Sequence, residues 1–309
     1  MHSTLIQMSL LMASGIIWRL IRPMGLSAEE TRKVLTTVVY YLFLPAMVLV
    51  VLWTADIGLQ SFQYAVLGVV TILSGMACFW VLGVCFKFEN RAFGAMILAS
   101  GFPNVTYLGL PVLEQTFGSW ARSVVIQLDL FAVSPLLFTL GIVVVRHYGK
   151  ESSAVRQPLV SFFNAPPFWA AGIAVILNLN GIASPVWLTV TLKQLSGAVV
   201  PLMLFSLGLA LSWQAIKLRN IPYIIPVIVI KMILVPIFAI IFVGFLTIGN
   251  NYKAAAVLDM AMPSMVLGIV LCDRYQLDSS LYAMVVTLTT LLSLIALPFW
   301  HHVLMMRFY

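Results

Sequence analysis

The sequence predicts an all-α integral membrane protein with ten transmembrane helices in two inverted five-helix repeats, with helices four and nine broken. Composition is the first observation behind this prediction, because the 309 residues are 62% hydrophobic and only 9% charged, whereas soluble chains are roughly 25% charged. The second observation is the length of the apolar runs, and the third is the distribution of Lys and Arg between them. Such a chain has the bilayer as its main solvent.

Ten apolar runs with few charges are long enough to cross a bilayer, since roughly 30 Å of hydrocarbon needs about 20 helical residues. We expect helices over 3–21, 34–54, 62–86, 92–117, 122–145, 162–180, 186–212, 220–247, 254–272 and 279–304. Barrel strands would alternate polar and apolar residues, and these runs do not. The first run is interpreted as a helix and not as a cleavable signal, because it ends at Arg19 without a small-residue cleavage site.

Lys and Arg are concentrated in alternate connectors, which predicts the orientation. One set of connectors holds Arg19, Arg22, Arg32, Lys33, Lys87, Arg91, Arg146, Lys150, Arg156, Lys217, Arg219 and Arg274, and the other holds only Arg122, Lys253 and Arg307. Positive connectors tend to stay in the cytoplasm. We therefore expect the connector around Lys150 to be cytoplasmic and both termini to lie outside.

That connector, residues 150–161, divides the chain into a first repeat over 1–149 and a second over 162–309. Five helices in each half force the second half to cross in the opposite sense, so the repeats would be inverted. Short matches between the fourth and ninth helices agree with this division. The matched pairs are Ala95 with Ala255, Leu98 with Leu258, Pro103 with Pro263 and, after a slip of one residue, Gly109 with Gly268.

The fourth run cannot be a regular helix throughout. Pro103 cannot donate a hydrogen bond to the carbonyl of Ala99, and Pro263 interrupts the ninth run in the same way. Asn104 and Ser264 follow these prolines, and both are residue types that cap helix starts. A half-helix that begins inside the membrane directs its free N–H groups at a bound anion. One proline predicts only a kink, but two breaks in inverted halves indicate a transport site.

Three ionisable residues, Asp129, Lys231 and Asp259, fall inside predicted helices, and Lys193 falls near the start of another. Charged groups at membrane depth usually face a partner or a wet cavity. One interpretation makes Lys231 the partner of an anionic substrate, with Asp259 or Asp129 accepting a proton. The other is an internal ion pair between Lys231 and one of the aspartates. Lys193 is expected near the membrane interface.

The segment from Phe102 to Pro111, FPNVTYLGLP, resembles the Asn-and-Gly-Leu-Pro signature of the auxin efflux carrier family, and Ala261–Ser264 resembles that family's Ala-Met-Pro-Ser element. The resemblance implies two inverted five-helix repeats whose helices four and nine cross. It also implies a carboxylate substrate, such as malate or malonate in bacterial members, with Pro103, Asn104 and Pro263 lining its site. The plant members' large loop between helices five and six is absent here, which favours a bacterial type in the inner (plasma) membrane.

The combined expectation is a secondary active transporter of small organic anions, namely mono- or dicarboxylates such as malate- or malonate-like compounds. It would work by alternating access, as a uniporter or with proton coupling. The expected substrate-binding residues are Pro103, Asn104, Thr106, Tyr107, Pro263, Ser264 and Lys231, and the expected coupling residues are Asp259 and Asp129. We expect no metal and no cofactor.

The alternatives are a sodium-coupled symporter of the same fold, a receptor or channel, and an intramembrane enzyme. The enzyme is disfavoured because the chain has neither HExxH nor GxSxG. The expected partners are a small anionic substrate and the lipid bilayer, with homodimer formation left open. Nucleic acid is not expected, because the cations lie in short connectors and form no basic stripe.

Overall fold

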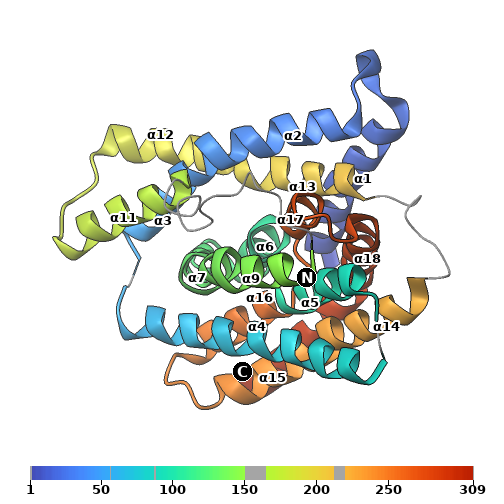
Figure 1. Cartoon of the computed structure of the whole chain (residues 1–309). Coiled ribbons are helices and arrows are strands. Elements are labelled where there is room, and N and C mark those ends of the chain that lie inside the picture. The colour runs from blue at the N-terminus through green and yellow to red at the C-terminus, as the bar shows by residue number, and fades with distance from the viewer. Residues whose placement is uncertain (1, 56, 87, 150–164, 212–219, 309) are drawn as a thin grey trace.

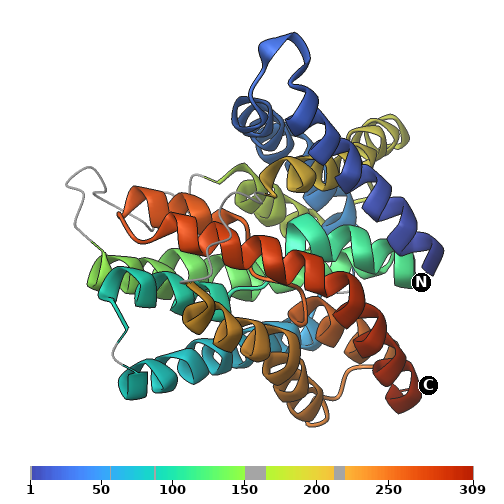
Figure 2. The ribbon, with the colours of Figure 1, turned by 90° about the vertical axis from the view of Figure 1, so that its right-hand side faces the viewer.

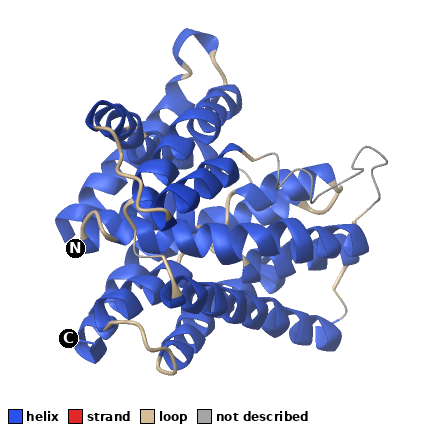
Figure 3. Cartoon of the chain, turned by 90° about the vertical axis from the view of Figure 1, so that its left-hand side faces the viewer, coloured by secondary structure: helices blue, strands red, loops and turns tan. Residues whose placement is uncertain are grey.

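The structure is a computed structural model that describes residues 2–55, 57–86, 88–149, 165–211 and 220–308. Helices account for the regular structure of this part of the chain (Figure 3). The predicted connector at 150–161 lies outside the described residues. Two short non-helical segments, at 102–104 and 262–265, interrupt the helical pattern and meet at an isolated β-bridge. We call them the extended segments.

The first half of the chain supplies the helices that the apolar runs predict, with some divided by π-turns. They are α1 (His2–Ile21), α2 (Ala28–Val38), α3 (Leu44–Trp53), α4 (Leu59–Phe86), α5 (Asn90–Gly101), the π-turn η3 (Val105–Gly109), α6 (Leu110–Phe117), α7 (Ala121–Leu128), α8 (Ser134–Leu136) and α9 (Ile142–Tyr148).

The second half follows the same order. Its elements are α11 (Pro166–Leu179), α12 (Val186–Gly197), α13 (Val199–Ala210), α14 (Ile221–Val229), the π-turn η8 (Ile230–Leu234), α15 (Val235–Val243), α16 (Asn250–Met260), α17 (Leu267–Arg274) and α18 (Ser279–Phe308). The short helix α17 is separated from α16 by the second extended segment, as α6 and η3 are separated from α5 by the first.

Long apolar helices make the chain a multi-span membrane protein, as predicted. Six helical segments of the described chain are long and apolar enough to cross a bilayer: Ala28–Trp53, Leu59–Val84, Ala121–Tyr148, Val186–Ala210, Ile221–Val243 and Ser279–Phe308. Gln7–Ile21 and Pro166–Leu179 are shorter apolar helices. Large side chains such as Trp187 and Ile295 are more than 70% exposed, which is typical of a surface solvated by lipid.

The helices form two groups, and each half of the chain contributes to both (Figures 1 and 2). One group contains α1, α2 and α3 from the first half with α11, α12 and α13 from the second, and α1 packs on α13 as α3 packs on α11. The other group contains α4 to α9 with α14 to α18. The start of α1 and the end of α18 lie at the same side of the molecule (Figures 2 and 3).

Glycines allow α1 and α13 to approach closely. A Cβ atom added to Gly15 would lie 2.2 Å from the carbonyl oxygen of Phe205, and one added to Gly208 would lie 2.0 Å from that of Met12. Small residues at such contacts let the backbones of membrane helices pack directly against each other. This contact holds α13 in place, and α13 also packs against η3 and α6.

Candidate functional site

The two helix breaks lie against each other and are hydrogen-bonded. Pro103 and Ser264 form an antiparallel bridge. The backbone N–H of Asn104 donates to the carbonyl of Pro263 at 2.8 Å, and the N–H of Met265 donates to the carbonyl of Phe102 at 3.0 Å. Extended backbone at membrane depth needs such partners because no water or lipid group supplies them. The breaks are therefore built into the interior of the protein.

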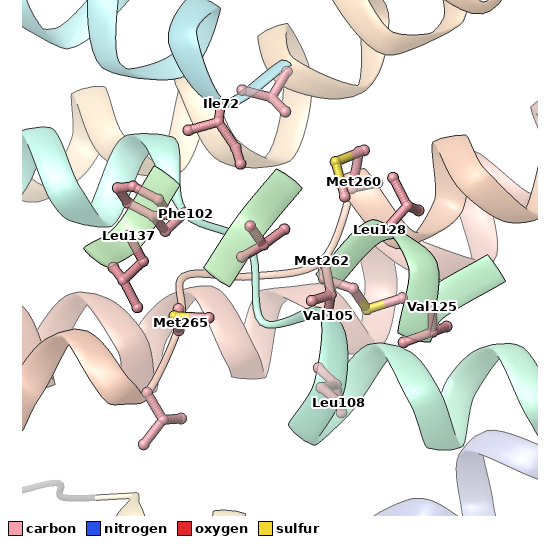
Figure 4. Close-up of a cluster of buried hydrophobic side chains, with 14 of the residues drawn as sticks. Ile72, Phe102, Val105, Leu108, Val125, Leu128, Leu137, Met260, Met262 and Met265 are labelled. Carbon is pink, nitrogen blue, oxygen red and sulfur yellow. The ribbon is translucent and has the colours of Figure 1, made fainter. Parts of the chain in front are cut away.

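Apolar side chains surround the bridge and exclude lipid from it. Figure 4 shows Phe102, Val105, Met262 and Met265 around the two extended segments, and each of the four is at most 6% exposed. Tyr282 adds a polar contact, since its hydroxyl donates to the carbonyl of Met265 at 2.9 Å. The site thus has a rigid, dry frame.

The carbonyls at the end of α5 are bound by side chains from the second half of the chain. Because Pro103 has no N–H, the carbonyl of Ala99 is free, and it accepts the Ser264 hydroxyl at 2.7 Å. The carbonyl of Gly101 accepts a hydrogen bond from Lys231 Nζ at 3.3 Å. Both donors are fully buried. A cation beside a helix C-terminus also opposes the negative end of the helix dipole.

The prediction that Ser264 caps a helix start is wrong. The helix after the second break begins at Leu267, with Val266 as the capping residue and no side-chain cap bond. Ser264 lies in the extended segment, where its hydroxyl satisfies the carbonyl of Ala99 instead. This bond links the two breaks through a side chain in addition to the two backbone bonds.

Asn104 lies where the helix restarts, directly before η3, but its side chain makes no capping bond, so the predicted role of its amide as a cap is also wrong. Both polar atoms of that amide are buried without a partner among the described residues. Burying such a group unpaired costs free energy. An unpartnered amide beside a helix break is consistent with a residue kept for binding.

The two aspartates within the predicted helices have different surroundings. Asp129 in the π-turn after α7 accepts hydrogen bonds from the Thr106 hydroxyl and, at 2.8 Å, from the Ser134 hydroxyl. Asp259 in α16 is fully buried, and neither of its carboxyl oxygens has a partner in the part of the chain that the structure describes. It lies against Gly109, where an added Cβ would be 2.1 Å from Oδ1.

The expected alternative of an ion pair between Lys231 and an aspartate is not found. Within the described residues, Lys231 instead donates to the Gly101 carbonyl, and an ion pair is formed by Arg122 and Glu114. The same part of the chain contains no group of three His, Cys, Asp or Glu residues that could hold a metal ion.

A cavity of about 70 Å³ lies beside the breaks, and we call it the crossing cavity. It is lined by Arg32, Thr36, Tyr107, Ser206, Leu207, Val266, Leu267 and Val270. Tyr107 comes from η3, and Val266 and Leu267 form the start of α17. The Ser206 hydroxyl is 2% exposed and has no partner in the described chain. The cavity therefore combines a cation, a free hydroxyl and a helix N-terminus.

A wider cavity of about 370 Å³, the arginine vestibule, shares Arg32 with the crossing cavity. Arg19, Arg22 and Glu29 also line it, and Arg19 donates a hydrogen bond to the carbonyl of Leu209 at 2.9 Å. Three guanidinium groups against one carboxylate leave this entrance positively charged, which attracts anions.

Of the predicted site residues, Pro103, Asn104, Pro263 and Ser264 meet at the breaks, and Thr106 joins Asp129. Tyr107 lines the crossing cavity, whereas Lys231 lies behind the end of α5 and lines neither that cavity nor the vestibule. Sequence reasoning missed Arg32 and Ser206. A capping box at Ser27 and Glu30, which starts α2 before Arg32, was the available signal for Arg32.

Helices that span a membrane, two paired breaks within them and an adjacent charged cavity define a membrane transporter. Residues 2–301 match the family model described as "Membrane transport protein". The chain therefore belongs to this family, which is the auxin efflux carrier family that the sequence motifs resemble. It is a transporter family and not an enzyme family.

Three relatives align with nearly the whole chain, and each is described only as an uncharacterised transporter. The relative from Methanothermobacter thermautotrophicus is 29% identical and covers 92% of this chain and 93% of its own length. That from Methanocaldococcus jannaschii is 28% identical with 91% and 92% coverage, and that from Escherichia coli is 24% identical with 89% and 90% coverage. The similarity thus supports transport over the full length.

Proposed function

We propose that the chain is a secondary active transporter of small organic anions, mono- or dicarboxylates such as malate or malonate, in the bacterial inner membrane. The observation that carries this proposal is the lining of the crossing cavity. The Arg32 guanidinium has no hydrogen bond or ion pair within the described residues, the start of α17 lies beside it, and the Ser206 hydroxyl is unpartnered. Each of these groups favours a carboxylate.

The proposed path runs from the arginine vestibule to the helix breaks. The vestibule, at about 370 Å³, falls in the size range of small-molecule sites. The crossing cavity at about 70 Å³ is much smaller, so we place only one carboxylate group there, against Arg32 and Ser206. The remainder of the substrate extends into the vestibule, and release to the other side requires the two helix groups to move relative to each other.

We further propose ten spans in two inverted repeats, over 1–149 and 162–309. The order of elements supports it, because each half gives its first helices to one group and its later helices, with one break, to the other. An even number of spans returns the chain to the side where it began, and both ends of the described chain lie at one side (Figures 2 and 3). The distribution of Lys and Arg among the connectors supports an outside location for that side.

For coupling, we propose uniport or proton symport, with Asp259 as the proton carrier. Its two oxygens are buried without partners, and an unpaired charge is costly to bury, so this carboxyl group is suited to exchange a proton when a change of state admits water. Asp129 is a weaker candidate, because both of its oxygens accept hydrogen bonds. Lys231 supports the site by holding the Gly101 carbonyl.

Sodium coupling is the second candidate. The unpartnered oxygens of Asp259 and Asn104 are the hard ligand type that Na⁺ accepts in broken-helix transporters. The two candidates predict different effects of Asp259→Asn. Loss of uptake driven by a pH gradient, with retained substrate counterflow, supports proton coupling. Sodium-driven uptake that disappears in the same variant supports sodium coupling instead.

Binding of malate and malonate to Arg32→Gln and Lys33→Gln, measured by calorimetry in detergent, tests the anion site. The two variants lose the same charge from neighbouring residues, but Lys33 is exposed and lines neither cavity. Loss of a charged hydrogen bond costs about 1.5–3 kcal/mol, so Arg32→Gln should weaken binding by roughly 10- to 150-fold. Equal affinities of the two variants would contradict the proposed site.

A further inference from the structure

A second polar cavity, which we call the lysine cavity, lies at the opposite end of the same helices. Its volume is about 360 Å³, and it is lined by residues 50–55 of α3 and its end, residues 119–127 around the start of α7, and Lys193 of α12, among others. The vestibule is lined by residues 27–32 at the other end of the continuous Ala28–Trp53 segment. At about 1.5 Å per residue, the two cavities are roughly 30 Å apart and lie toward opposite membrane faces.

The lysine cavity has a net positive lining. Lys193 is exposed, and its ammonium group has no hydrogen bond or ion pair in the described chain. Arg122 also lines the cavity, but Glu114 neutralises its charge. The positive charge of Lys193 therefore disfavours a cationic ligand, and a monoanion would neutralise it.

Gln127 supplies the second polar feature. Its side chain is 2% exposed and lines the cavity. The amide nitrogen donates to the Ser123 hydroxyl at 2.8 Å, while the amide oxygen is buried without a partner among the described residues. A buried oxygen of this kind needs a donor. A simple carboxylate has none when ionised, whereas a hydroxyl group on the same ligand provides one.

Aromatic side chains form the remaining wall. The rings of Trp120 and Tyr252 meet edge to face with centroids 5.0 Å apart, and both line the cavity with Tyr64. Such a surface suits the short carbon skeleton of a small organic acid. The charge thus comes from α12 and the acceptor from α7, while the aromatic wall comes from α4, α16 and the residue before α7.

We propose that the lysine cavity binds a small hydroxycarboxylate, whose carboxylate pairs with Lys193 and whose hydroxyl donates to the amide oxygen of Gln127. The site is separate from the crossing cavity, so it does not depend on the substrate proposed there. The ligand is either a substrate of the carrier at its opposite access point or an anion that binds without being carried. In both cases the cavity binds the same groups, a carboxylate and a hydroxyl.

Calorimetric titration of the purified full chain with l-lactate and with propionate tests this proposal. The two acids have the same number of carbon atoms and differ in the hydroxyl. A site that hydrogen-bonds a hydroxyl rejects the analogue that lacks it, so we expect at least about tenfold tighter binding of lactate. Gln127→Leu should bring the two affinities together, because the acceptor is removed and an apolar side chain of similar length fills its place.

Lys193→Gln should weaken the binding of both acids by about tenfold. The matched control is Lys253→Gln, which removes a charge from outside the cavity lining and should leave both affinities unchanged. Equal binding of lactate and propionate by the wild-type chain, or equal effects of the two lysine variants, would overturn the proposal. Loss of lactate binding in Arg32→Gln would also overturn it, by placing the ligand in the crossing cavity.

Uptake of radiolabelled lactate into proteoliposomes separates the two sources of ligand. Uptake that is lost in Lys193→Gln and kept in Lys253→Gln assigns the cavity to the transport path and supports the proposal. Binding with the predicted lactate preference but without uptake also supports it, and identifies an anion that is held and not carried. Failure of malate transport alone leaves these binding results unaffected.

Discussion

The bond between Ser264 and Ala99 can be tested with a matched pair of serine variants. Ser264→Ala removes the donor at 2.7 Å from the Ala99 carbonyl, which has no helical partner because residue 103 is proline. Ser100→Ala is the control, because Ser100 is also fully buried, lies one residue from Ala99, and carries a hydroxyl without a partner in the described chain. The two variants therefore delete the same atom type from the same region.

An unsatisfied buried carbonyl costs about 1–3 kcal/mol, so Ser264→Ala should lower the free energy of unfolding by that amount. Ser100→Ala should leave it unchanged or raise it slightly. With an unfolding entropy of about 2.1 cal/mol/K per residue, the expected difference in Tm between the two variants is roughly 1.5–5 °C. Thermal unfolding of both variants in the same detergent measures it. Equal Tm values would show that Ser264 does not hold the two breaks together.

Three further predictions follow from the same region. Gly109→Ala should destabilise the protein by about 1–3 kcal/mol, because the new Cβ would lie 2.1 Å from Asp259 Oδ1. The control Gly172→Ala should not destabilise it, because no atom lies within 4 Å of the added Cβ. Equal Tm values for the two variants would refute the close contact between Gly109 and Asp259. Asn104→Ala should abolish transport without lowering Tm, since its amide has no partner to lose; a large fall in Tm would instead indicate a structural role. Gly208→Leu should separate α13 from α1 and lower Tm by several degrees relative to Gly197→Leu, which has open space around it, as a thermal melt of the pair would reveal.

Helix positions were predictable because the length of an apolar run can be counted directly along the sequence, without knowledge of tertiary contacts. A run must cover the hydrocarbon, and a residue in it must be apolar or find a partner. The prolines were informative for the same reason. Pro103 frees the carbonyl of Ala99 whatever surrounds it, so sequence alone identified an acceptor that the fold had to satisfy.

The partner of that acceptor was not predictable, because Ser264 reaches it only across two segments that are 165 residues apart in the chain. Residue type suggested a helix cap for Ser264, and tertiary contact overrode that local preference. Lys231 shows the same limit. Its burial was expected, but whether it would meet an aspartate, a substrate or a carbonyl depended on how α5 and η8 pack.

Arg32 was misassigned for a different reason. It was counted among the connector charges that predict the orientation, but α2 begins at Ala28 and extends the second span toward its N-terminus by six residues beyond the predicted start at 34. The guanidinium therefore projects from a helix into the cavity. The capping box at Ser27 and Glu30 marks this start in the sequence, and reading it would have placed Arg32 within the helix.

We propose that this chain carries small organic anions through the crossing cavity, and a direct test is uptake of radiolabelled malate and malonate into proteoliposomes, with pH, sodium and voltage gradients imposed one at a time. We expect saturable uptake that Arg32→Gln abolishes and Lys33→Gln retains, and the gradient that drives it would identify the coupling ion. Absence of uptake of either acid by folded protein under every gradient, or equal uptake by the two variants, would contradict it.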